Sequence, residues 1–227
     1  MALHLGDLAR ELQQESTLQD TLDGIVRAAV DNVPGAWMAG ISSVEGRRKI
    51  STTAGSHPLA FEVDRLQYRV GEGPCLSAIY DQRTLRLPDM TAETRWPTFT
   101  EQAWKLGIGS MLSFQLYVEN EDLGALNLYH PEPGGFDDES EHVGLLFATH
   151  AAVAMAGSLA RHQLSLAVAT RDLIGQAKGI LMERHRLTGD QAFELLVRAS
   201  QRGNMKLRDV AEQLTSSGEL PGREQAS

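Results

Sequence analysis

The chain has 227 residues, of which 42% are hydrophobic and 22% are charged, and its formal net charge is −9. This length accommodates one large domain or two of ordinary size, and the hydrophobic content argues against a disordered chain. No run of about 18 apolar residues occurs and the first residues are acidic and amphipathic, so we expect a cytoplasmic protein without a membrane partner.

The N-terminal part of the sequence is predicted to be helical. Apolar residues recur at spacings of three and four from Leu3 to Val33, which indicates two short helices or one interrupted helix that Pro34 and Gly35 end. We assign residues 1–17 to a separate helical segment in front of the first domain.

Two hairpins with interspersed helices follow. This order is typical of an α+β domain in which helices cover at least one face of a sheet, and we place it over residues 18–160. The expected strands are residues 36–44, 49–54, 84–87, 110–118 and 123–129. Helices are expected over residues 58–67 and 96–106, and a short helix that ends at Tyr80 follows a tight loop at residues 71–75.

A single long helix is expected from the acidic run at Asp137 to about His185. Within it every seventh residue is apolar, which is typical of a parallel two-stranded coiled coil and predicts a homodimer. The alternative is one helix packed against its own sheet, which explains the first half of the repeat better than the second. The repeat consists of Ala152, Leu159, Leu166, Leu173 and Ile180.

The C-terminal region is predicted to contain two further helices. Thr188 followed by Gln191 fits a capping box that opens the first, and Gly203 suits a left-handed residue at its end. The next helix is expected to begin at Asn204. With the end of the long helix, these two complete a three-helix bundle over residues 161–215, and a frayed tail is expected over residues 216–227.

Charge is distributed unevenly between these two regions. Residues 1–160 carry 11 Lys and Arg against 22 Asp and Glu, a net of −11, whereas residues 161–227 carry 10 against 8, a net of +2. A cationic module behind an anionic body indicates that the two regions meet different partners. The C-terminal region is the one suited to a polyanion.

Metal and enzyme chemistry have little support in the sequence. Cys75 is the only cysteine, which rules out an internal disulfide and a cysteine zinc cluster. The seven histidines have no HExxH or comparable spacing, so we expect neither a metal nor a cofactor. No constellation of acid, base and nucleophile is evident, and we expect no catalytic residues.

Three motifs in the C-terminal region resemble a known family. The runs AKGILMER at 177–184, AFELL at 192–196 and KLRDVA at 206–211 are similar to the ANTAR domain of bacterial transcription antitermination regulators, over about residues 165–215. The run VGEGPCL at 70–76 resembles the GAF domains that accompany ANTAR modules in actinobacteria, over about residues 18–160. The combination is typical of GAF–ANTAR proteins.

The resemblance implies a signal-responsive, RNA-binding transcription antiterminator. ANTAR domains bind paired stem-loops in leader transcripts as dimers and prevent formation of an overlapping terminator hairpin. The GAF resemblance implies an antiparallel sheet with flanking helices that receives a small-molecule or redox input, with no identity for the ligand. The rival interpretation is a DNA-binding regulator that uses the last two helices as a helix-turn-helix. An enzyme on the GAF fold is disfavoured by the lone thiol.

Candidate RNA contacts follow from the match and from the placement of the basic residues. Gly179 alternatively admits a neighbouring helix of the bundle, Asn204 alternatively caps the last helix, and Met182 is expected in the core rather than under a base. The candidate set is Lys178, Gly179, Arg184, Arg202, Asn204, Lys206 and Arg208.

Cys75 is the one candidate redox residue. It stands where a loop opens a short helix, a position that can lower the pKa of a thiol and raise its reactivity. The alternative, which we favour, is a small buried side chain.

Overall fold

The protein was examined as a computed structural model that describes residues 12, 15–45, 49–80, 84–119 and 121–221. The chain divides into two compact units, Met1–Ala160 and Arg161–Ser227. The helical segment predicted over residues 1–17 lies almost entirely outside the described residues.

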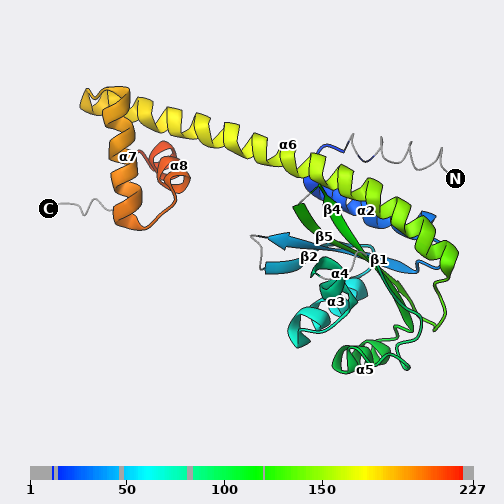
Figure 1. The fold of residues 1–227 in the computed structure, drawn as a ribbon. Helices are drawn as coiled ribbons and strands as arrows, with labels where there is room; N and C mark the ends of the chain where they lie inside the picture. Colours follow the sequence, from blue (N-terminus) through cyan, green and yellow to red (C-terminus); the bar gives the residue numbers. More distant parts are fainter. Residues whose placement is uncertain (1–11, 13–14, 46–48, 81–83, 120, 222–227) are drawn as a thin grey trace. The chain divides into compact units, whose positions relative to one another are not determined.

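The first unit is built on one five-stranded sheet with the strand order β2-β1-β5-β4-β3 (Figure 1). Every pair of neighbouring strands is antiparallel, and both predicted hairpins are confirmed. The strands are β1 (Met38–Glu45), β2 (Lys49–Gly55), β3 (Thr84–Leu87), β4 (Ser110–Val118) and β5 (Glu121–His130).

Helices cover both faces of this sheet (Figure 1). Helix α2 (Leu18–Asn32) and the first part of α6 (Asp138–His185) pack on one face, around a core that includes Leu112, Phe114 and Leu126. The helices α3 (Pro58–Val70), α4 (Pro74–Tyr80) and α5 (Pro97–Lys105) lie on the other face. Strand residues alternate between the two cores because successive side chains of a strand point to opposite faces.

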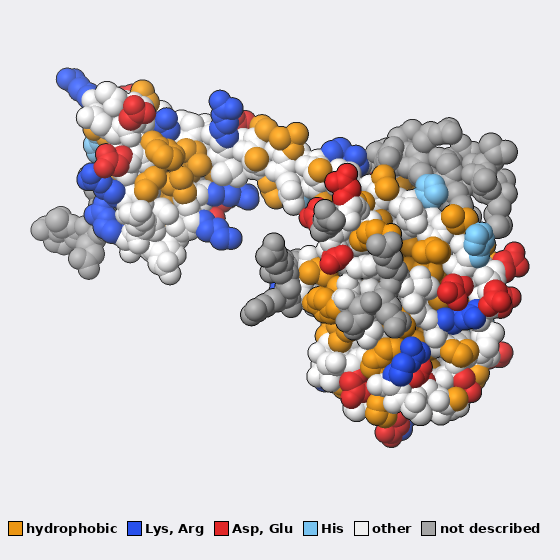
Figure 2. Space-filling view, viewed as in Figure 1, with side chains coloured by type: hydrophobic (Ala, Val, Ile, Leu, Met, Phe, Trp, Pro, Cys, Tyr) orange, Lys and Arg blue, Asp and Glu red, His pale blue; other side chains and the backbone are white. Residues whose placement is uncertain are grey.

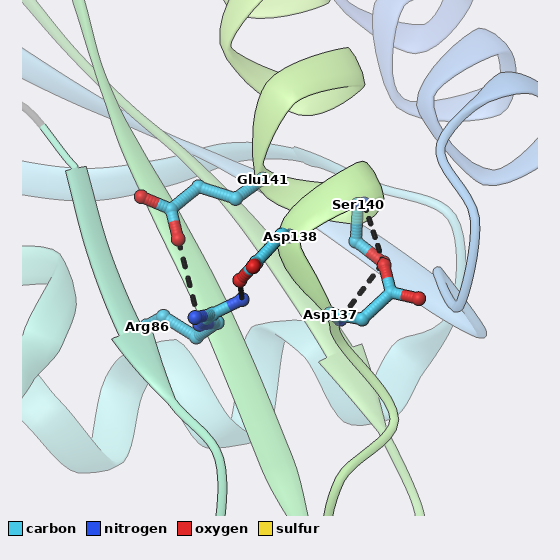
Figure 3. Close-up of polar contacts among 5 residues, drawn as sticks. All are labelled: Arg86, Asp137, Asp138, Ser140 and Glu141. Carbon is cyan, nitrogen blue, oxygen red and sulfur yellow. Dashed lines mark hydrogen bonds and ion pairs between the residues drawn. The ribbon is translucent and has the colours of Figure 1, made fainter.

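The start of α6 is fixed by polar contacts (Figure 3). The carboxylate of Asp137 accepts hydrogen bonds from the backbone N and the hydroxyl of Ser140, at 2.9 and 3.0 Å. Arg86 of the edge strand β3 reaches Asp138 at 2.9 Å and Glu141 at 3.4 Å. These ion pairs are partly exposed, so they orient the helix end more than they stabilise the fold.

Helix α6 is 48 residues long and contains a stretch apolar enough, by length and composition, to cross a membrane. The sequence has no uninterrupted apolar run of that length, so this stretch was not predicted. Half of that stretch is buried within the protein, where Val143, Phe147, Ala151 and Met155 pack into the core shared with α2. Its apolar character is therefore that of a core helix.

The second unit is a small helical bundle. The last turns of α6 pack with α7 (Gly189–Gly203) and α8 (Leu207–Ser217). The predicted capping box is confirmed, because Thr188 and Gln191 exchange both hydrogen bonds, at 2.9 and 3.3 Å. The buried core consists of Ala177, Leu181, Ala192, Leu196, Ala199, Val210, Ala211 and Leu214.

The turn between α7 and α8 differs from the prediction. Gly203 is the last helical residue of α7, and Asn204 takes the left-handed conformation with φ 46° and ψ 40°. Asparagine tolerates this region because its short polar side chain can bond locally. Helix α8 begins at Leu207 and retains Ser216 and Ser217, while residues 222–227 lie outside the described part of the chain.

Most residues of the predicted coiled-coil repeat pack within the chain itself. Ala152 is buried and Leu159 half-buried in the first core, whereas Leu173 and Ile180 pack against the core of the second unit. Leu166 alone stays exposed. The alternative of a helix packed against its own sheet thus holds for the first half of the repeat, and a second intramolecular core accounts for the other half.

Candidate functional site

The predicted RNA contacts on α6 lie on its surface within the second unit. The Lys178 ammonium lies 5.8 Å from the ring centroid of Phe193, which comes from α7. Gly179 is exposed, and a Cβ added there would meet nothing within 4 Å. The alternative that Gly179 admits a neighbouring helix of the bundle is therefore wrong for this chain.

Arg184 and Arg202 are exposed but already have partners in the chain. The Arg184 guanidinium donates to the carbonyl of Gly218, the residue that ends α8. Arg202 Nε donates to the carbonyl of Arg198 at 3.3 Å. Both side chains therefore already donate hydrogen bonds to backbone carbonyls near helix ends. A phosphate that contacted either side chain would share its N–H donors with these carbonyls.

The remaining candidates gather at the turn into α8. Asn204 is the left-handed C-cap of α7, so the alternative that it caps α8 is wrong. Lys206 is the N-cap of α8 and makes no side-chain capping bond. Lys206 and Arg208 are both exposed, next to the first amides of a helix, where the helix dipole favours an anion.

The predicted contacts come from two parts of the second unit. Lys178, Gly179 and Arg184 belong to α6, whereas Asn204, Lys206 and Arg208 belong to the turn and the start of α8. On the face shown in Figure 2, Lys and Arg side chains lie around hydrophobic side chains of the second unit.

Two exposed residues near Lys178 were not predicted as RNA contacts. Phe193 is 41% exposed, and Met182, which was expected in the core, is 39% exposed. A signal was present, because Ala192, Leu196 and Ala199 already supply the buried face of α7 at helical spacing. Phe193 lies outside that face.

The first unit contains a buried polar network between the sheet and α3. At its centre the carboxyl of Asp64 accepts hydrogen bonds from Tyr129, from Asn127 at 2.9 Å and from Thr52 at 3.0 Å. Asp64 has no exposed surface, and burial, the largest effect, raises its pKa from 3.8 to about 6, although these hydrogen bonds oppose the shift. A titratable group thus lies in the middle of this core.

Cys75 joins the edge of the same network. Its thiol donates to Ser42 at 3.0 Å, and its backbone N donates to the Gln67 side chain at 2.9 Å. Burial, followed by the nearby Asp64, raises the pKa of the Cys75 thiol to about 12. The environment is therefore that of a small buried side chain, and a raised pKa disfavours the thiolate that redox chemistry requires.

No group of three or more His, Cys, Asp or Glu side chains in the described part of the chain is arranged to hold a metal ion. The polar network instead consists of one carboxyl, one thiol, hydroxyls and amides, all of which find partners among themselves. Such groups are suited to binding through hydrogen bonds rather than to metal coordination.

Comparison with known protein families identifies two domains in the chain. The family model of the GAF domain matches residues 15–156, and that of the ANTAR domain matches residues 162–214. A search of curated proteins gives no match.

Solved structures share the fold of the first unit. The GAF domain of a phosphoenolpyruvate-protein phosphotransferase from Coxiella burnetii is 18% identical, with a TM-score of 0.54 over 70% of this chain and 94% of that one. Free methionine-R-sulfoxide reductase from Neisseria meningitidis is 15% identical, with a TM-score of 0.55 over 69% and 89%. At such identities the likeness shows the fold alone.

Cys75 is expected to resist thiol reagents in the native protein. With a pKa of about 12, almost none of the thiol is ionised at pH 8, and the side chain is buried. Ellman's reagent should leave the folded chain unlabelled and should label one thiol per chain after denaturation. Labelling of the folded protein at the rate of a free cysteine would contradict this view.

Asp64→Asn is expected to change how stability depends on pH. Because the folded-state pKa of about 6 exceeds the ordinary 3.8, the contribution of Asp64 is complete below about pH 4 and is lost as the pH rises through 6. The loss is on the order of 3 kcal/mol. Between pH 4 and pH 7 the Tm of the wild type should therefore fall relative to that of the variant.

Tryptophan fluorescence isolates this effect, because Trp37, Trp96 and Trp104 all lie in the first unit. Asp89→Asn is the matched control. Hydrogen bonds from Thr91 lower the pKa of the half-buried Asp89, so its contribution to stability should change with pH in the opposite direction. A Tm difference between wild type and Asp64→Asn that does not vary with pH would show that Asp64 does not titrate in this range.

Proposed function

Since the chain belongs to the GAF domain family, in the GAF–ANTAR combination of regulators, we propose that it prevents terminator formation by binding stem-loop leader RNA as a dimer. An ANTAR domain is an RNA-binding antiterminator module and a GAF domain is a sensor, so the general kind of function follows from the two domains. Both are regulatory rather than enzymatic. A small-molecule ligand of the sensor and a cytoplasmic location are parts of the same proposal.

The strongest support for RNA binding comes from exposed cationic side chains of the second unit. Lys206 and Arg208 are exposed and form no ion pair with any described carboxylate, and they flank the uncapped start of α8. Phosphates of a folded RNA fit such a site, because lysine, arginine and helix-start amides all bind them.

The composition of α8 disfavours DNA binding by a helix-turn-helix. In that mode the second helix lies in the major groove, between two rows of phosphates. The exposed face of α8 carries Asp209 and Glu212 as well as Arg208. Two carboxylates in the groove would be repelled by the phosphates.

The dimer is proposed to form through a face of α6 other than the predicted repeat. Seven residues on this face recur at alternating spacings of four and three, which is the spacing of a coiled-coil seam, and none of them is buried within the chain. Leu164, at 67% exposure, is the most exposed large apolar residue of the second unit. The seven are Leu146, His150, Val153, Gly157, Ala160, Leu164 and Ala167.

Lys178→Ala and Lys206→Ala are each expected to weaken RNA binding. Each lost phosphate contact releases one counterion fewer, so the slope of log K against log salt should become shallower by roughly 0.7 to 0.9. Filter binding of a stem-loop RNA at several salt concentrations measures both effects. Lys105→Ala, which removes an exposed lysine of the first unit, should change neither, and unchanged binding in both test variants would refute this surface.

Wild-type protein should prefer the stem-loop RNA to a DNA duplex of the same sequence. Competition between the two at fixed salt gives the ratio directly. A preference for the duplex DNA would exclude the antiterminator and restore the helix-turn-helix interpretation.

Leu164→Asp should shift the protein toward the monomer, whereas Leu166→Asp should not. The two leucines are both exposed and lie two residues apart, on opposite sides of α6, so each is a control for the other. Sedimentation at low micromolar concentration measures the mass. Dissociation by Leu166→Asp alone would favour the original repeat, and a dimer that survives both changes would exclude either seam.

A further inference from the structure

Phe193 is an exposed aromatic ring that the core of the second unit does not use. It is 41% exposed, and the buried cluster of α6, α7 and α8 is complete without it. Tyrosine and tryptophan do not occur in residues 161–227, so Phe193 is the one aromatic side chain, histidines apart, in that part of the sequence. An exposed ring that is not part of the buried core of its own unit is available to a partner.

The surroundings of Phe193 combine apolar surface with one cation. The Lys178 ammonium lies 5.8 Å from the ring centroid. A Cβ placed on Gly189, at the start of α7, would lie 3.6 Å from Lys178 Nζ and 3.9 Å from Met182 Sδ. Met182 is itself 39% exposed. The Lys178 ammonium therefore lies near the Phe193 ring and, at the start of α7, near the Met182 thioether.

Two exposed glycines leave the backbone of α6 uncovered next to Lys178 and Met182. Gly175 and Gly179 are exposed and four residues apart, so they share one side of the helix, and a Cβ on either would meet nothing within 4 Å. Each glycine in a helix interior costs about 1 kcal/mol relative to alanine. Nothing in the unit needs the space that these glycines leave open, so the uncovered backbone is suited to close approach by a partner.

We propose that this surface binds an unpaired nucleotide of the RNA. The base stacks on the Phe193 ring beside Met182, Lys178 binds the adjacent phosphate, and the sugar-phosphate backbone passes over Gly175 and Gly179. The inference rests on the proposed function and extends it, because it assigns three residues that the predicted set of RNA contacts did not include: Gly175, Met182 and Phe193.

A nucleotide fits this surface better than an apolar protein segment does. A protein segment that covered Phe193 would also bury the Lys178 ammonium, and a buried charge without a partner is strongly unfavourable. A nucleotide supplies a flat base for the ring and a negative phosphate for the ammonium. Stacking also requires a base outside a duplex, which directs this surface to the loop of the RNA rather than to its stem.

The first test replaces Phe193 in the full-length chain. Phe193→Leu keeps an apolar side chain and removes the ring, and it should weaken binding to a stem-loop RNA by roughly 5- to 150-fold without changing the salt slope. Phe193→Tyr keeps the ring and should bind within about twofold of the wild type. With 2-aminopurine placed in turn at each loop position, the wild type and Phe193→Tyr should quench one position that Phe193→Leu does not.

The second test separates binding from stability at the two glycines. Gly179→Ala should raise the Tm of the second unit slightly, because alanine is the better helix former and the site has room for its methyl group. The same change should weaken RNA binding, because the methyl group holds the backbone of the RNA away. Ala169→Gly, which removes a methyl group from an exposed position of the same helix outside the proposed dimer face, should lower the Tm and leave RNA binding unchanged.

The outcomes distinguish this inference from the proposed function. If the wild type binds no stem-loop RNA, the proposed function fails. If the wild type binds and Phe193→Leu binds equally, with the same quenching, the function stands and the stacking site is wrong. If Phe193→Leu lowers the mass of the RNA-free protein and leaves RNA affinity unchanged, the surface is a protein interface and the inference is overturned.

Discussion

The fold depends on one helix that is a structural part of two hydrophobic cores. Helix α6 buries residues such as Phe147 and Ala151 beneath the sheet, and it buries Ala177 and Leu181 against α7 and α8. Each core packs against a different part of this helix. The residues between the two, 161–169, are exposed on all sides. The apolar side chains of that stretch are therefore not stabilised by burial within the chain. We propose that a second copy of the chain covers them.

The two cores differ in the chemistry that they bury. The bundle core contains only aliphatic side chains, whereas the first unit places the Asp64 carboxyl among the side chains of Thr52, Asn127 and Tyr129. A buried carboxyl is unfavourable unless its hydrogen bonds are complete, so any molecule or proton that enters this network must replace bonds that already exist. The network therefore couples events at the sheet to the stability of the first unit, a property that the apolar bundle lacks.

Most local signals in the sequence predicted the structure correctly, apart from the turn after α7, whereas the repeat that depends on tertiary contacts did not. The capping box at Thr188 and Gln191 involves two residues of one turn, and both hairpins follow from alternation within each strand. The seven-residue repeat of α6 marks buried positions, yet a repeat cannot tell whether a sheet, a bundle or a second chain buries them. For Cys75 the sequence favoured a small buried side chain over a reactive thiol, and its burial and raised pKa agree with that prediction.

The proposed RNA surface makes two kinds of contact, and neither an RNA stem nor a single strand alone satisfies both. In the proposed complex Lys206 and Arg208 bind phosphates, and a stem alone supplies these, with an affinity that falls as salt rises. Phe193 requires an unpaired base, which a stem lacks, and its contribution depends little on salt. A single strand offers bases but presents its phosphates in no fixed arrangement. Only a loop closed by a stem places both in a defined geometry, so the division of the surface between cations and one aromatic ring selects the folded RNA that an antiterminator must recognise.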